Sequence, residues 1–181
     1  MQTHTRSVAA MAGAALLLST IAAVADEGPT GTWSVKNGVA LIRIVDCGGK
    51  YWGVVAWEKS PGVDSHNPDP ALRSRPTLGM PVLLGMSADG ANRWSGRIYN
   101  SEDGQTYDSH IRLTGANALR VEGCVFGFLC GGETWTRSAA APPVVAQNRH
   151  AHTRATTGAG GPRSSIAQEP AAKICSSLGR S

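Results

Sequence analysis

Hydrophobic and polar residues alternate one by one over much of the chain between Gly31 and Arg137, which is the period of a β-strand with one buried face. Around residue 111, Ile111 and Leu113 fall on one face while His110 and Arg112 fall on the other. Residues 119–125 repeat this pattern. One buried and one solvated face indicate an antiparallel sheet around a single core.

Turn residues break this periodicity at short intervals and divide it into about eight predicted strands. Gly or Pro interrupts nearly every window of about ten residues, so helices fit this region poorly. Asn37-Gly38, Asp89-Gly90 and Asp103-Gly104 are typical of hairpin turns, and each lies between two candidate strands. The predicted strands are Gly31–Ser34, Val39–Asp46, Tyr51–Glu58, Pro81–Met86, Arg93–Asn100, Thr106–Thr114, Ala118–Phe126 and Gly132–Arg137.

About eight antiparallel strands in roughly 110 residues close most economically into one small up-and-down β-barrel, because closure leaves no exposed strand edge. A small β-sandwich is the alternative. In a closed barrel the first and last strands are neighbours, which brings Trp33 close to Arg137. We expect Arg137 to cover Trp33 and plug one end of the barrel, a structural role that contributes roughly 1 to 2 kcal/mol of cation–π energy.

The N-terminal residues follow the pattern of a secretory signal peptide. Arg6 precedes an apolar and small-residue run over residues 8–23, and an Ala-Val-Ala sequence ends at Ala25, just before two acidic residues. The run is about 16 residues long, shorter than the roughly 20 that a membrane-spanning helix needs. We therefore expect cleavage after Ala25, no stable membrane insertion, and a mature protein in the periplasm or outside the cell. A retained N-terminal anchor is the alternative.

The C-terminal residues 138–181 are rich in Ala, Pro, Gly, Ser and Thr and contain no aromatic residue. Such a segment buries too little apolar surface to offset the entropy lost on ordering. The sequence thus predicts a signal peptide over residues 1–25, a β-barrel domain over residues 26–137 and a disordered low-complexity tail over residues 138–181.

The basic character of the chain, with a net charge of +4 and a pI of about 9.1, comes mostly from this tail. Residues 26–137 hold 11 Lys or Arg against 12 Asp or Glu, net −1, whereas residues 138–181 hold five basic residues against one acidic residue, net +4. The folded part has no basic excess and the tail has no aromatic residue for base stacking. We therefore expect no nucleic-acid partner.

Several motifs occur in an order that resembles the exported bacterial family DUF2147. They are GTWSV from Gly31, DSHNPDPALRSRPTLGMPVL from Asp64, RWSGRIYNSEDGQTY from Arg93 and ETWTR ending at Arg137. The family is itself similar to the lipocalin-like barrels of the calycin superfamily. The resemblance therefore implies a lipocalin-like barrel over about residues 31–137, and it implies little about chemistry.

Four cysteines suit an oxidising compartment. Cys124 and Cys130 lie symmetrically about Gly127, so a hairpin that turns there places them opposite each other, within reach of a disulfide. We predict this pairing. Members of the similar family often carry a second Cys a few residues after the position of Cys47, and this chain does not. Cys47 is then either a free thiol or paired with Cys175.

Candidate binding residues come from two regions. An eight-stranded barrel either fills its interior with side chains or holds one small ligand; Trp52, Trp57 and Trp94 are candidate lining residues, with Ile98 and Leu119, and a solid core is the alternative. The long connection over residues 59–78 concentrates polar residues, and its binding candidates are Asn67, Asp69, Arg73 and Arg75. The same residues also suit a lid ordered by turns of its own backbone.

Signals for metal binding and catalysis are weak. Asp64, Asn67 and Asp69 do not have calcium-loop spacing, and His66 has no second His at ligand spacing. No G-x-S-x-G motif or C-x-x-C motif is present. We expect no cofactor, no metal and no enzymatic activity, although residues distant in sequence can still assemble a Ser, His and Asp arrangement.

Two functions fit these features. The first is a lipocalin-like binder of a small, partly apolar ligand in the cell envelope. The second is an envelope protein-interaction module with a solid barrel and a docking loop at residues 59–78. The fold analogy favours the first, the sequence names no ligand, and the oligomeric state is left open.

Overall fold

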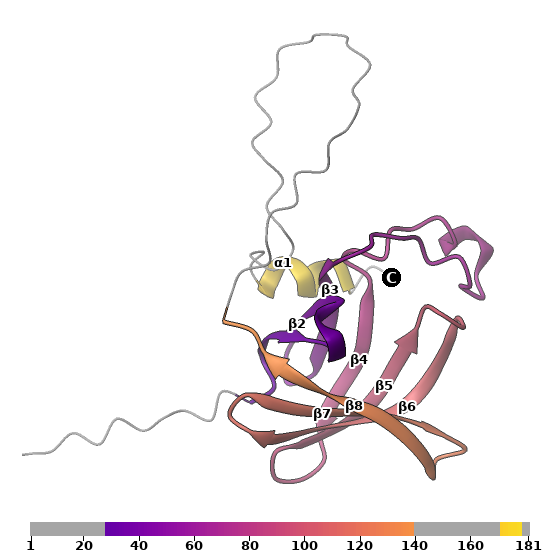
Figure 1. The fold of residues 1–181 in the computed structure, drawn as a ribbon. Coiled ribbons are helices and arrows are strands. Elements are labelled where there is room, and N and C mark those ends of the chain that lie inside the picture. The colour runs from indigo at the N-terminus through magenta and orange to yellow at the C-terminus, as the bar shows by residue number, and fades with distance from the viewer. Residues whose placement is uncertain (1–27, 140–170, 179–181) are drawn as a thin grey trace, which may run out of the picture.

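Eight antiparallel strands close into a barrel in the computed structural model, which describes residues 28–139 and 171–178 (Figure 1). Each strand pairs with the next along the chain, and the first strand also pairs with the last, with Trp33 opposite Arg137. This confirms the predicted up-and-down barrel. The strands are β1 (Gly31–Ser34), β2 (Ala40–Asp46), β3 (Tyr51–Glu58), β4 (Pro81–Ala88), β5 (Arg93–Asn100), β6 (Gln105–Gly115), β7 (Ala118–Val125) and β8 (Leu129–Arg137).

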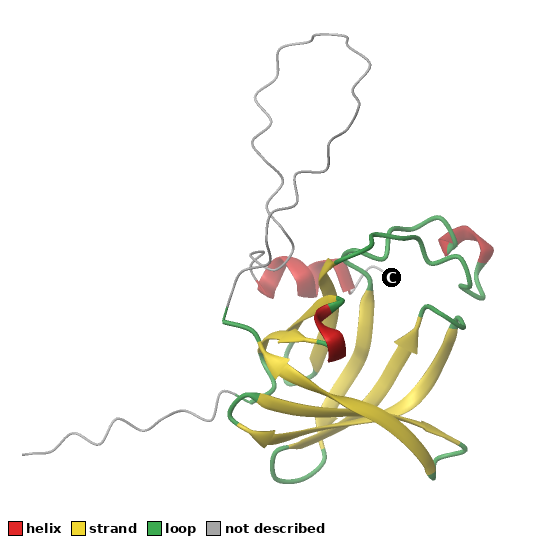
Figure 2. Cartoon of the chain, in the orientation of Figure 1, coloured by secondary structure: helices red, strands yellow, loops and turns green. Residues whose placement is uncertain are grey.

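Helical segments are short in the described residues (Figure 2). Two 3₁₀ turns, η1 (Lys36–Gly38) and η2 (Pro70–Leu72), lie in connections between strands. One α-helix, α1 (Ala171–Leu178), follows the barrel in sequence. None of these described helices has the length and apolar character needed to cross a membrane. The predicted signal peptide and most of the predicted tail lie outside the described residues.

The up-and-down topology sorts the connections between strands onto two ends of the barrel. The connections over residues 35–39, 59–80, 101–104 and 126–128 lie at one end, which we call the rim. The connections over residues 47–50, 89–92 and 116–117 lie at the opposite end with residues 28–30, and we call this end the base. Any difference between the two ends therefore concerns different loops.

Arg137 and Trp33 plug the base. The Arg137 guanidinium lies over the Trp33 ring at 4.3 Å from its centroid, the arrangement expected from the sequence. Its nitrogens donate hydrogen bonds to the carbonyls of Thr30 (2.7 Å), Ala116 (3.0 Å) and Gly28 (3.3 Å). Trp33 Nε1 donates to the carbonyl of Pro29 at 2.8 Å. The base is thus closed by bonds between the first strand, the last strand and the residues before β1.

Large apolar side chains pack inside the barrel and form the core. All eight strands contribute, and the strand periodicity places these residues on the inner face. The buried members are Trp33, Ile42, Ile44, Val55, Leu83, Met86, Trp94, Ile111, Leu119, Val121 and Trp135. In this part of the interior, packed side chains leave a solid core, which is the alternative that the sequence left open.

Helix α1 packs on the outer face of β2 and β3, where Ile174 joins Val45 and Val54 in a second buried cluster. A disulfide between Cys47 and Cys175 ties α1 to the barrel, which decides between the two states left open for Cys47. The prediction of a tail without structure is therefore wrong for residues 171–178. The cause is local: Ile174 and Leu178 give this short stretch an apolar face that the composition of the whole tail conceals.

A second disulfide joins Cys124 and Cys130, whose Cα atoms are 4.0 Å apart. The two residues are cross-strand partners in the β7–β8 hairpin, which is the pairing predicted from their symmetry about Gly127. This bond closes only a short hairpin, whereas the Cys47–Cys175 bond joins residues 128 positions apart.

Candidate functional site

The inner face of strands β5 to β8 carries a row of small residues. Gly96 pairs with Ser109, Ser109 with Gly123, and Gly123 with Gly131, so that four neighbouring strands contribute only Gly and Ser at this level. We call these four residues the small-residue row. Side-chain volume is therefore low along this line of the inner face. The Met86 side chain lies against Gly96, whereas no other atom of the described residues comes within 4 Å of the point where a Gly131 Cβ would stand.

The next level toward the rim is apolar and incompletely buried. Ile98 pairs with Tyr107, and Val125 pairs with Leu129. The pairing of Asp108 with Cys124 aligns Tyr107 with Val125 at the same level. Ile98 and Tyr107 are half-buried, and Val125 and Leu129 are 42% and 58% exposed. Apolar surface on the inner face at the rim thus remains without cover from the described residues.

The level below the small-residue row, toward the base, contains an inward carboxylate. Trp94, Ile111 and Val121 are buried at this level, and Glu133 pairs with Val121 on the same face. Glu133 Oε1 accepts hydrogen bonds from Trp135 Nε1 at 2.7 Å and from the backbone N–H of Lys36 at 3.4 Å. The described residues supply no hydrogen bond to Oε2, so that this oxygen can accept one from another molecule.

Ser109 adds a second polar group to the same region. Its side chain is almost completely buried, at 1% exposure, and its Oγ has no hydrogen-bond partner among the described residues. A buried hydroxyl without a partner is costly, and most such groups in proteins are satisfied. The small-residue row thus contains an unused donor and acceptor, one level from the Glu133 carboxylate.

The long β3–β4 connection is held in place by a buried carboxylate, Asp64. Tyr99 Oη and Asn67 Nδ2 donate to it at 2.6 and 2.7 Å, and Arg75 donates through Nε at 2.9 Å and through Nη2 at 2.8 Å. Burial acts to raise the pKa of Asp64, but these hydrogen bonds and the charge of Arg75 outweigh it and hold the pKa below its ordinary value. Burial, followed by the nearby carboxylate, raises the pKa of Tyr99. The carboxylate therefore stays charged and ties the connection to β5.

The remaining polar residues of this connection also bond within it. The Asn67 Oδ1 atom accepts from the backbone N–H of Asp69, Asp69 Oδ1 caps η2 through Ala71, and Arg73 Nε donates to the Asn67 carbonyl. Gly104 in the β5–β6 turn packs directly on the His66 carbonyl, at a position with φ of 71° and no room for a Cβ. The connection is an ordered part of the rim.

The structure separates the predicted binding residues into four places. The four polar candidates, Asn67, Asp69, Arg73 and Arg75, come together in the β3–β4 connection. Trp94 lies in the core against Tyr51. Trp57 is half-buried beside Leu41 in the β2–β3 register, and its Nε1 has no partner among the described residues.

The expectation that Trp52 faces the interior is wrong, because Trp52 packs on the outer face, against the cluster of Val45, Val54 and Ile174. Its neighbour Tyr51 points inward instead. Sequence reasoning missed Glu133, Ser109 and Gly131 as site residues. The sequence does contain a signal for them, because alternate residues of a strand lie on the same face. Glu133 and Gly131 lie on the same face of β8 as Trp135, and Ser109 lies on the same face of β6 as Ile111. Glycine and acidic residues are easily assigned to solvent when only the apolar positions are followed.

A serine, a histidine and an aspartate do meet on the outer face. Ser95 Oγ lies 2.9 Å from His110 Nδ1 and donates a hydrogen bond to Asp89, which also pairs with Arg93. The bond from Ser95 and the charge of Arg93 lower the pKa of Asp89. In a catalytic triad the carboxylate orients the imidazole, whereas here it binds the serine. Asp89 therefore does not orient His110 as a triad carboxylate would, and the arrangement lacks the succession of hydrogen bonds that would activate Ser95 as a nucleophile.

Comparisons with known proteins agree on the fold. A profile of the family described as "Uncharacterized protein conserved in bacteria (DUF2147)" matches residues 31–137. Among solved structures, the chain is similar to a Helicobacter pylori protein described as "Protein HP1028 from the human pathogen Helicobacter pylori belongs to the lipocalin family". The similarity has a TM-score of 0.56 and 21% identity, over 61% of this chain and 82% of that chain. No curated protein matches. The barrel is thus lipocalin-like in fold.

Proposed function

The chain belongs to the bacterial family DUF2147, and we propose that it binds a small, partly apolar ligand inside the rim end of its barrel. The observation that carries the proposal is the contrast between the two halves of the interior. Large buried side chains fill the base half and, through Leu83 of β4, reach the rim level opposite Ile98. On β5 to β8, by contrast, the small-residue row and the incompletely buried apolar level above it line the rim half. A ligand of modest size would rest on the packed core and cover the apolar inner face.

Polar groups in this region define the rest of the ligand. Glu133 Oε2 has acceptor capacity. Ser109 Oγ has both donor and acceptor capacity but is fully buried, so a ligand reaches it only by displacing the side chains packed around it. A few polar groups in an otherwise apolar site are the usual means of orienting a small ligand. The ligand that we propose has an apolar body, which contacts the rim level. It carries a hydrogen-bond donor, such as an amine or hydroxyl, at the end nearest Glu133.

The setting of this activity is the cell envelope. Two disulfides suit an oxidising compartment, and the N-terminal sequence has the pattern of a secretory signal peptide. Both features support export to the periplasm or the medium. The proposed role is that of a carrier or sensor without catalytic activity, and it needs no cofactor.

A direct test is mass spectrometry of the protein purified from the cells that export it, once intact under native conditions and once as an organic extract. An unrelated exported protein treated in the same way is the control. We expect one small molecule in stoichiometric amount that the control lacks. An empty protein that also fails to bind the neutral apolar dye N-phenylnaphthylamine would overturn the proposal.

The site itself is tested by filling it. Gly131→Leu places an apolar side chain at a point where its Cβ has no contact within 4 Å in the described part of the chain, and the φ of Gly131 is not in the left-handed region. We expect dye or ligand affinity to fall at least about tenfold, a loss of roughly 1.4 kcal/mol, because the new side chain occupies the same space. Thr134→Leu, on the outer face of the same strand, is the matched control and should leave affinity unchanged. Equal affinities for both variants would place the ligand elsewhere.

A further inference from the structure

Exposed large hydrophobic side chains gather at one end of the molecule. Every such side chain among the described residues lies on a rim connection or at a strand end that borders one, and none lies at the base. Three of the four rim connections contribute. The residues are Val39, Val63, Leu72, Leu78, Val125, Phe126, Phe128 and Leu129.

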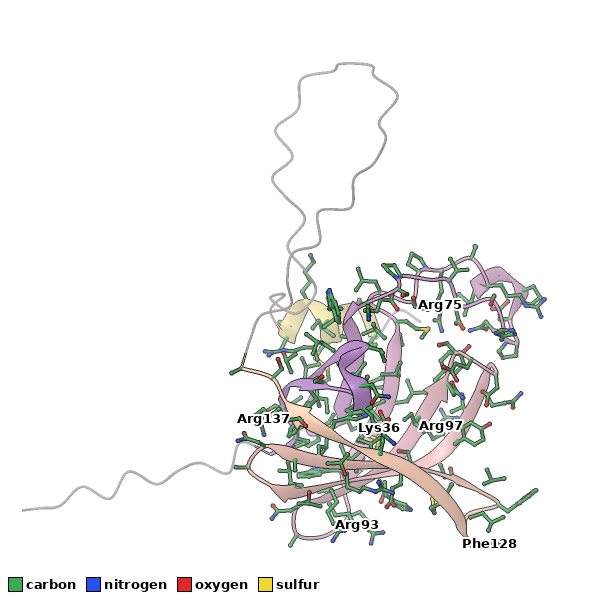
Figure 3. The ribbon with its side chains drawn as sticks, viewed as in Figure 1. Lys36, Arg75, Arg93, Arg97, Phe128 and Arg137 are labelled. Carbon is green, nitrogen blue, oxygen red and sulfur yellow. A yellow bond between two sulfur atoms is a disulfide. The ribbon has the colours of Figure 1, made fainter. Side chains whose placement is uncertain are left out.

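The β7–β8 hairpin carries the most exposed of these residues. Phe126 is 83% exposed and Phe128 is 74% exposed, on either side of Gly127. Figure 3 shows Phe128 at the outer end of this hairpin, on the side of the barrel away from Arg137. The Cys124–Cys130 disulfide closes the hairpin directly behind the turn, so the backbone of the turn has little conformational freedom to lose when the two rings bind.

The charges of the rim balance. Its four connections contain as many basic as acidic side chains, and the Asp64 and Arg75 pair is already internal to the β3–β4 connection. The turn between β5 and β6 is acidic. The basic residues are Lys36, Lys59, Arg73 and Arg75, and the acidic residues are Asp64, Asp69, Glu102 and Asp103.

We propose that the rim docks on a lipid surface of zwitterionic headgroups, with Phe126 and Phe128 inserted among the headgroups. The balanced charge of the rim gives no attraction to an anionic surface, whereas two exposed aromatic rings on a rigid turn favour the interface between water and hydrocarbon. This goes beyond ligand binding and does not depend on it. When both hold, the proposed site opens toward the lipid from which an apolar ligand would come.

A lipid surface fits the positions of these residues better than a groove in a partner protein. On the hairpin, Val125 and Leu129 lie on the inner face, and Phe126 and Phe128 lie on the turn itself. A protein groove would cover one face of the hairpin, whereas a fluid headgroup layer surrounds the turn. The other exposed apolar residues lie on the β1–β2 and β3–β4 connections of the same end.

The test is vesicle flotation with the protein purified from the cells that export it, using phosphatidylcholine vesicles and vesicles of phosphatidylcholine and phosphatidylglycerol in equal amounts. Intact mass establishes that all samples share one N-terminus. We expect binding to pure phosphatidylcholine that resists added salt and does not increase with phosphatidylglycerol. The F126S/F128S variant should bind at least about tenfold more weakly, because it loses both inserted rings. The matched F126L/F128L variant keeps the apolar surface and should retain most of the binding.

Three results would overturn the proposal: no binding of the parent protein to phosphatidylcholine, binding only to anionic vesicles, or equal binding of the parent and F126S/F128S. Near-ultraviolet circular dichroism checks that the variants fold. The single variants F126S and F128S, each expected to weaken binding, replace the double variant where it unfolds. N-phenylnaphthylamine binding in vesicle-free buffer should be equal for the parent and F126S/F128S, which separates a failure of lipid docking from a failure of ligand binding.

Discussion

Asp64 is the residue on which the order of the rim depends most. Its carboxylate is fully buried, and such a charge is tolerated only when its hydrogen-bonding capacity is used. Tyr99 from β5 and Asn67 and Arg75 from the connection itself all donate to it. The polar composition of this connection therefore has a structural explanation, since its prominent side chains bond to one another.

Asp64→Asn should lower the free energy of unfolding by about 2 to 3 kcal/mol, because it removes the charge that Arg75 and Tyr99 bind. The folded-state pKa of Asp64 lies below its unfolded value. The stabilisation is thus fully present above about pH 4, and it is lost as the pH falls through the folded-state pKa. Urea unfolding at several pH values measures the difference between parent and variant.

Glu102→Gln is the control for this prediction, because Glu102 is exposed and the described residues give its carboxylate no partner. It should change stability by no more than about 0.5 kcal/mol. An Asp64→Asn variant as stable as the parent at neutral pH would show that the charge contributes nothing net, and the pH dependence assigned to it would be absent.

At the scale of elements, the two disulfides have different tasks. The Cys124–Cys130 bond stiffens one hairpin, whereas the Cys47–Cys175 bond fixes a separate helix on the outer face of β2 and β3. The helix buries only Ile174 fully among its residues, and eight residues form an unstable helix by themselves. Helix α1 therefore depends on its covalent link and on the barrel surface.

Removal of each disulfide should reveal this difference. In the loop-closure model, a bond between residues 128 positions apart contributes about 5 kcal/mol, and one between residues 6 positions apart about 2.4 kcal/mol. We therefore expect C47S/C175S to lose roughly twice as much unfolding free energy as C124S/C130S. Guanidinium unfolding of both variants measures the two losses, and a larger loss for the hairpin variant would contradict this assignment.

At the scale of the whole molecule, much of the fold follows from the sequence. Period-two alternation and turn dipeptides locate all eight strands, since strands with one buried face leave the clearest pattern. The site is harder to predict, because it depends on the exact register between neighbouring strands. Gly96, Ser109, Gly123 and Gly131 are far apart in sequence and form one row only through the register. The expectation for Trp52 fails because the outer-face cluster against which it packs includes Ile174, which comes from a remote segment of unpromising composition.

Closure of the barrel is a property of the whole molecule to which Arg137 contributes several side-chain contacts. Arg137, at the end of the last strand, stacks on Trp33 of the first strand and donates to the carbonyls of Gly28, Thr30 and Ala116. Lysine keeps the charge but cannot supply three directed bonds from a planar group that also stacks. Arg137→Lys should therefore lower the unfolding free energy by about 2 to 3 kcal/mol, as the loss of hydrogen bonds from a charged group suggests.

The control is Arg97→Lys, an exposed position in β5 that should change stability by no more than about 0.5 kcal/mol. Unfolding followed by both tryptophan fluorescence and far-ultraviolet circular dichroism measures the effect. If closure by Arg137 holds the first and last strands together, the two signals should still change in one transition, only at lower denaturant, because every strand depends on the closed sheet. Separate transitions in Arg137→Lys would mean that the β1–β8 seam opens while the remaining strands stay folded, and Arg137 would then stabilise one seam and not the whole barrel.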